Sequence, residues 1–159
     1  MKAFDGSYIE GFEGAVGNMS REDYVAKGMA AFQEAARKGY LIAFTCGLGT
    51  NLQDADEAPR SPGEAQQSVE SGDRLTYLLA MFLICAEKHS YFNIHDSYDA
   101  KTSKTWMKHP RELDRPLGAP QGPAVRSGYI YTREFAHASV RLDIEKQTGS
   151  ILWHDALKE

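Results

Sequence analysis

Acidic side chains, a histidine and an aromatic ring follow two predicted strands of this chain. Glu10 and Glu13 lie at the end of the first strand, and His95, Asp96 and Tyr98 at the end of a later one. In parallel α/β folds, ligands bind beyond the carboxyl ends of the strands. Paired carboxylates there suit glycoside hydrolysis, in which one protonates the leaving oxygen and the other attacks the sugar or activates water. Glu10, Glu13 and Asp96 are therefore candidate catalytic residues.

Glu10 has the most informative surroundings of the three acids. In strand register Tyr8, Glu10 and Phe12 share one face, so Glu10 is expected to sit in a cleft among aromatic side chains. Such a position suits an acid catalyst. The alternative for each acid taken singly is a loop cap or a solvated charge, and the pattern alone leaves both open.

Aromatic side chains near these acids suit sugar binding, because an aromatic face accepts the apolar face of a pyranose. Tyr129 and Tyr131 fit a packed strand at least as well, whereas Trp106 lies in a polar stretch and is easier to place at a surface. The candidate substrate-binding residues at this point are Tyr8, His95, Tyr98 and Trp106.

The sequence lacks the motifs that are typical of other kinds of catalytic or cofactor site. The five histidines are scattered, without HExxH, HxH or CxxC spacing, so we expect no metal. No GxSxG elbow, GxGxxG fingerprint or Walker loop is present, which argues against a serine triad and a nucleotide cofactor. Cys46 and Cys85 lie in apolar runs and are predicted to be free core thiols. We expect no cofactor.

Composition narrows the class of protein further. The chain of 159 residues is 42% hydrophobic and 25% charged, as in globular domains, and its net charge is -4. Its Lys and Arg residues are dispersed, so a nucleic-acid partner is not expected. The longest apolar run, 78–86, is far shorter than the ~20 residues that span a bilayer. The opening residues lack the apolar core of a secretory signal, which favours a cytoplasmic location by default.

Hydrophobic periodicity predicts alternating strands and helices up to residue 96. Ser20 and Asp73 are the expected N-caps of the two helices. This order favours right-handed βαβ units and a parallel sheet. The continuously apolar segment 40–46 is typical of a strand covered on both faces. The predicted strands are 7–12, 40–46 and 91–96, and the predicted helices 21–38 and 74–88.

The pattern changes after Pro110. Segment 47–72 is a long polar loop, and 116–123 is too rich in proline and glycine for regular structure. Three short strands are then expected at 128–135, 138–144 and 150–154, with a hairpin turn at 146–149. We expect one domain over 1–159.

Three segments carry a family resemblance: GSYIEGFEG, YFNIHDSYDAKTSKTWMKHP and LGAPQGP…GYIYTREFAHASVRLDI. Their order resembles the C-terminal half of glycoside hydrolase-like proteins with (β/α)8 barrels. The resemblance implies an α/β half of a TIM barrel, with βα units over about 7–110 and closing antiparallel strands over about 128–154. It makes Glu10 the barrel acid and places Arg133, a further candidate for substrate binding, in the closing strands. Glu13 has no counterpart in it.

The resulting hypothesis is a glycoside hydrolase-like domain that acts on a poly- or oligosaccharide. A complete barrel has about 250 residues, so a truncated or split barrel is implied. The expected partner is a second copy in a homodimer or the missing N-terminal half of a parent barrel. The alternatives are a non-catalytic carbohydrate-binding module and a small α/β enzyme of another class that uses His95 and Asp96.

Overall fold

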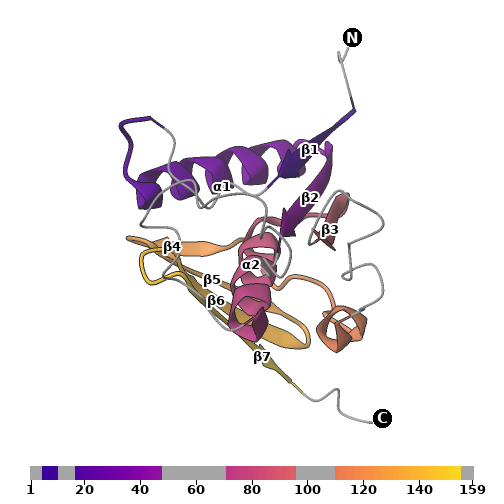
Figure 1. The fold of residues 1–159 in the computed structure, drawn as a ribbon. Helices are drawn as coiled ribbons and strands as arrows, with labels where there is room; N and C mark the ends of the chain where they lie inside the picture. The colour runs from indigo at the N-terminus through magenta and orange to yellow at the C-terminus, as the bar shows by residue number, and fades with distance from the viewer. Residues whose placement is uncertain (1–4, 11–16, 48–70, 96–109, 155–159) are drawn as a thin grey trace, which may run out of the picture.

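The computed structural model describes residues 5–10, 17–47, 71–95 and 110–154, which form a mixed α/β fold with two separate sheets (Figure 1). The first sheet is parallel, with strand order β1-β2-β3, and the second is antiparallel, with order β4-β5-β6-β7. The elements are β1 (Gly6–Glu10), α1 (Arg21–Arg37), β2 (Leu41–Gly47), α2 (Ser71–Cys85), β3 (Ser90–His95), the 3-10 helix η4 (Arg111–Asp114), β4 (Val125–Ser127), β5 (Ile130–Phe135), β6 (Ala138–Asp143) and β7 (Thr148–Trp153).

Helix α1 begins where the sequence places its cap. The Ser20 side chain accepts a hydrogen bond from the backbone N–H of Asp23 at 3.1 Å. The Asp23 carboxylate does not return a hydrogen bond to Ser20 but accepts one from the Tyr129 hydroxyl at 2.8 Å. That bond ties the start of α1 to the residue before β5.

Both helices pack on one face of the parallel sheet. Ile9, Phe44 and Phe92 are paired across its three strands and point to that face. The Phe44 ring stacks on Phe32 of α1 at 5.9 Å and lies 6.2 Å from Phe82 of α2. Two successive right-handed crossovers that advance in the same direction produce this one-sided arrangement.

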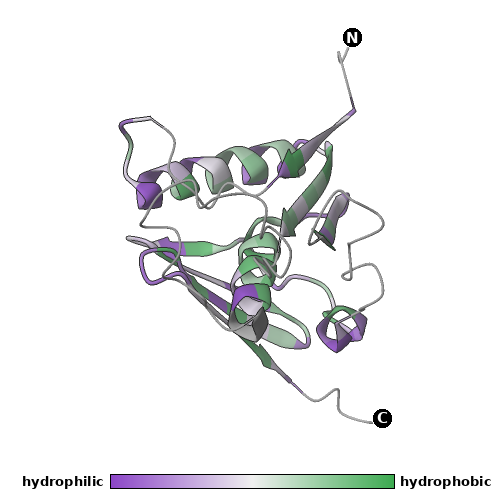
Figure 2. Cartoon of the chain, viewed as in Figure 1, coloured by the Kyte–Doolittle hydropathy of each residue, from purple (hydrophilic) through white to green (hydrophobic). Residues whose placement is uncertain are grey.

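Helix α2 lies between the two sheets. Phe82 contacts the parallel sheet, whereas the opposite side of the helix packs against β5, β6 and β7 (Figure 1). Its colouring is hydrophobic over most of its length (Figure 2). A helix that is apolar nearly all round is typical of burial on more than one side, and α2 is buried in this way between the two sheets.

A glycine sets how closely the second sheet approaches α2. A Cβ atom on Gly149 of β7 would lie 2.8 Å from the carbonyl oxygen of Thr76 and 2.9 Å from the Cβ of Ala80. Neither contact is possible for a real side chain, so the strand reaches the helix backbone only because residue 149 is glycine.

The structure corrects two predicted boundaries of the second helix and adds one strand. Helix α2 begins at Ser71, so Asp73 lies inside it and is not its N-cap, and it ends at Cys85 rather than 88. The second sheet has a fourth strand, β4, whose three residues are too few to show a period of two. The hairpin of β6 and β7 is confirmed, with Gln147 in the left-handed region at φ 54°.

No helix in the described ranges is long and apolar enough to cross a bilayer.

Candidate functional site at the strand ends

The parallel sheet has a second face, which the two helices do not cover. Glu10, Thr45 and Asn93 lie side by side on it, paired across β1, β2 and β3 near their carboxyl ends. We call these three residues the strand-end row. The amide of Asn93 donates a hydrogen bond to the Thr45 hydroxyl at 3.3 Å. Thr45 is 1% exposed, whereas Glu10 and Asn93 are exposed.

A second row lies on the same face, two residues earlier in each strand. Tyr8, Ala43 and Tyr91 are paired across the strands, and the two tyrosines are 59% and 56% exposed. Glu10 and Tyr8 thus share a face, as their spacing predicts. Glu10 is exposed, however, so the described residues do not enclose it in the expected cleft.

The prediction that β2 is covered on both faces is only partly met. On the helix-free face Leu41 is 45% exposed and Ala43 is partly exposed, although Thr45 is buried. A strand so apolar is typical of a sheet enclosed on both sides. In the described part of the chain, β1 and β3 each also have one edge without a partner strand.

Four predicted site residues lie outside the described residues, namely Glu13, Asp96, Tyr98 and Trp106. His95 is the last residue of β3, paired with Gly47, and its side chain is not described. Of the candidates at the strand ends, Glu10 and Tyr8 are therefore brought together, and those whose side chains are not described stay predictions.

Arg133 lies away from the strand-end row. Its side chain is 3% exposed, and it points from β5 to the end of α2. The guanidinium donates to the carbonyl oxygens of Leu83 at 3.1 Å and Ala86 at 2.6 Å, and to the Glu87 carboxylate at 3.1 Å. These hydrogen bonds join the second sheet to the helix, which is a structural role.

Asn93 is the member of the strand-end row that sequence reasoning missed. The alternation of side chains in 90–95 places Tyr91, Asn93 and His95 on one face of the strand. The resulting register with Glu10 depends on which strands are neighbours, and only the sheet order gives that.

The two cysteines provide no nucleophile in this structure. Both are free and buried, as predicted. Burial raises the pKa of the Cys85 thiol far above its usual range, so it stays protonated at neutral pH. Within the described residues, no three His, Cys, Asp or Glu side chains are placed to hold a metal ion.

The comparison with protein families gives one match. Residues 1–139 match the family described as hypothetical glycosyl hydrolase family 15. The chain belongs to this family. The match covers the whole parallel sheet, both helices and the second sheet as far as the start of β6. The comparison with curated proteins found no match.

Proposed function

We propose that this chain is a glycoside hydrolase domain in which Glu10 acts as a catalytic carboxylate. The observation that carries the proposal is the place of Glu10, at the carboxyl end of a parallel strand and on the face that α1 and α2 do not cover. Membership of the glycosyl hydrolase family supports the reaction class. Glu10 would act as the acid that protonates the leaving oxygen, or as the group that attacks the sugar.

The neighbours of Glu10 suit this role. Thr45 accepts a hydrogen bond from Asn93, so its own hydroxyl proton can be donated to the neighbouring Glu10 carboxylate. The exposed rings of Tyr8 and Tyr91 offer apolar faces to a pyranose on the same side of the sheet. We propose Glu13 or Asp96 as the second carboxylate.

The parallel sheet supports a barrel origin for the domain. In doubly wound sheets the helices cover both faces, whereas in (β/α)8 barrels they cover the outer face only. Here both helices lie on one face, and the strand-end row and the two tyrosines lie on the face that a barrel would enclose. We propose that the three strands are part of such a barrel.

A second copy of the chain is the proposed partner that covers this face. Among the described residues, β1 and β3 each have one edge without a partner strand, and Tyr8 and Tyr91 are exposed, which favours addition of strands. We expect light scattering at micromolar concentration to give twice the mass of one chain. A single-chain mass would reject the homodimer and leave the other half of a parent barrel as the partner.

The function is tested by replacing Glu10. We expect Glu10→Gln to lower kcat about 100-fold or more, measured as release of reducing ends from a panel of oligosaccharides. Glu145→Gln, at an exposed position after β6, is the matched control and is expected to leave the rate unchanged. The melting temperature should not change in either variant.

Equal rates for Glu10→Gln and the unmodified chain would remove Glu10 from the mechanism. A carbohydrate-binding module is the second candidate, favoured by the paired exposed tyrosines. It predicts saturable sugar binding that is lost in Tyr8→Ala, with no hydrolysis by any form. The third hypothesis, an enzyme that uses His95 and Asp96, predicts turnover that survives Glu10→Gln.

A further inference from the structure

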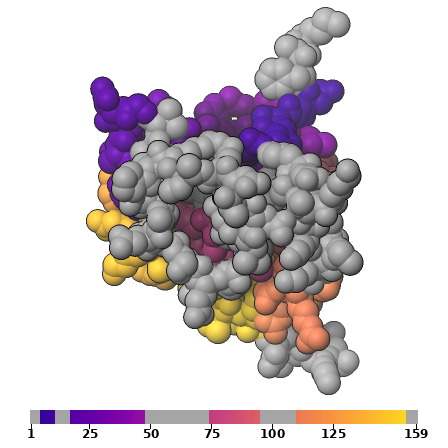
Figure 3. Space-filling view, viewed as in Figure 1, coloured from indigo at the N-terminus to yellow at the C-terminus, as the bar shows by residue number. Residues whose placement is uncertain are grey.

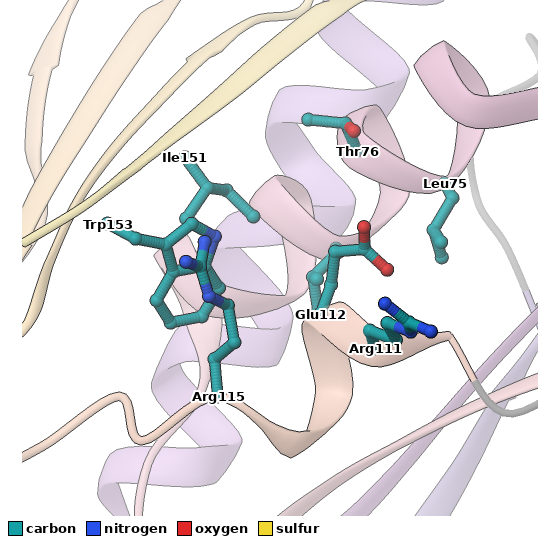
Figure 4. Close-up of a pocket in the computed structure, with 8 residues that line it drawn as sticks. Leu75, Thr76, Arg111, Glu112, Arg115, Ile151 and Trp153 are labelled. Carbon is teal, nitrogen blue, oxygen red and sulfur yellow. The ribbon is translucent and has the colours of Figure 1, made fainter. Parts of the chain in front are cut away.

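A cavity of about 450 Å³ lies between the first turns of α2, the helix η4 and the strand β7 (Figure 4). Leu75, Leu79 and Ile151 supply an apolar floor. The polar lining comes from Thr76 and from three charged residues of one short segment. These are Arg111, Glu112 and Arg115.

Arg115 is held in place by an aromatic ring. Its guanidinium lies over the Trp153 ring at 5.0 Å from the centroid, which is a cation–π contact. A guanidinium fixed by stacking keeps the N–H groups at its edge available, and it loses less conformational entropy when it binds a carboxylate.

Arg111 adds a second guanidinium to the same cavity. Figure 4 shows Glu112 on the same short helix, with its carboxylate directed toward the side of the cavity formed by α2. The salt bridges found in the described ranges involve other residues, so these three charged groups keep their bonding capacity for a ligand. Two guanidiniums and one carboxylate give the lining a net charge of +1.

We propose that this cavity binds an acidic sugar unit, a hexuronate within an oligosaccharide. The apolar floor suits the C–H face of a six-membered ring. The two arginines suit its carboxylate, and Glu112 suits its hydroxyls. That the ring is a sugar rests on the proposed function, whereas the selectivity for an anion rests on the arginines alone.

The site is separate from the strand-end row. Glu10, Thr45 and Asn93 lie on the face of the parallel sheet that points away from the helices, and the cavity lies where α2 meets η4 and β7. Figure 3 shows β1 in indigo at the upper right of the view and the orange segment that contains η4 at the lower right. The side chain of Arg74, next to the lining residue Leu75, donates a hydrogen bond to the carbonyl oxygen of Gly47 at 3.0 Å, so the first turn of α2 lies next to the carboxyl end of β2. The cavity would hold a further unit of the substrate chain.

Calorimetric titration of the full chain tests the proposal with a matched pair of probes. Trigalacturonate carries the carboxylates, and its fully methyl-esterified form keeps the rings without the charge. We expect saturable binding of the acid and binding of the ester that is weaker by about 10-fold or more.

Two variants and one control locate the binding. Arg115→Gln and Arg111→Gln should each weaken trigalacturonate binding by about 10-fold. Arg126→Gln is the matched control, because Arg126 also lies over an aromatic ring, Tyr131 at 5.4 Å, but outside the cavity. It should leave the affinity unchanged.

Three results would overturn the proposal: no binding of trigalacturonate, equal affinity for the ester, or equal weakening by Arg126→Gln. The titration is repeated on Glu10→Gln, which lacks the proposed catalytic carboxylate, so that binding is measured without hydrolysis of the probe. Unchanged affinity there supports a separate site, and loss of binding assigns the acid to the strand ends instead. If the chain binds trigalacturonate but hydrolyses none of the oligosaccharides, the proposal for this cavity stands and the proposed hydrolase function is rejected.

Discussion

Leu78→Asp is expected to leave no folded protein. Leu78 is 0% exposed at the centre of α2, the helix enclosed by both sheets. The substitution removes a buried apolar side chain and places a carboxyl group where no water reaches. The combined cost is on the order of 5 kcal/mol or more, comparable with the whole stability of a domain of this size. Circular dichroism should show loss of the cooperative thermal transition.

The same substitution on the surface provides the control. Leu152 of β7 is 65% exposed, so Leu152→Asp should change the free energy of unfolding by no more than about 0.5 kcal/mol. A folded Leu78→Asp variant that melts with the unmodified chain would contradict the placement of α2 between the sheets. Loss of the folded state in both variants would show that the effect does not depend on burial of the leucine.

The helices could be predicted because their signals are local. Ser20 precedes a run in which Val25, Met29 and Phe32 recur at helical spacing, and the structure buries these three side chains. The apolar run of α2 likewise shows that the helix is enclosed on several sides. Neither pattern depends on distant parts of the chain, since cap and period are both contained within about twenty residues.

The pairing of distant segments could not be predicted in this way. That Asn93 joins Glu10 depends on β2 lying between β1 and β3. The contact between Trp153 and Arg115, the residue after η4, depends on how the second sheet packs against α2. A one-residue shift in either register would send these side chains to the opposite face. The cavity beside α2 therefore became visible only in the structure.

Arg133 illustrates the same limit for a single residue. An arginine in a strand near the end of the chain is compatible with ligand binding, and the sequence alone does not show that it is buried. Its guanidinium instead satisfies carbonyl groups that helix α2 leaves free at its C-terminus. The positive charge there also complements the negative end of the helix dipole.

Arg133→Gln is expected to destabilise the fold by about 3–5 kcal/mol, because it removes the cation of a buried charge network and leaves the groups that it paired in place. In the unmodified chain the guanidinium donates to the carbonyl oxygens of Leu83, Ile84 and Ala86 and to the Glu87 carboxylate, and the shorter amide cannot replace these hydrogen bonds. Glu87, whose side chain is only 31% exposed, would be left without its cation. Urea denaturation followed by circular dichroism measures the change in the free energy of unfolding.

Two further variants separate geometry from charge. Arg133→Lys keeps the charge but presents a single ammonium group, which cannot reach the helix end and Glu87 in the same way, so we expect an intermediate loss of about 2 kcal/mol. Arg141→Gln is the control from the neighbouring strand. Its side chain is 49% exposed and its contact with Asp143 is 3.8 Å long, so the loss should stay below about 1 kcal/mol. If Arg133→Gln cost no more than Arg141→Gln, Arg133 would not be what joins β5 to the end of α2, and its assignment to substrate binding would regain its force.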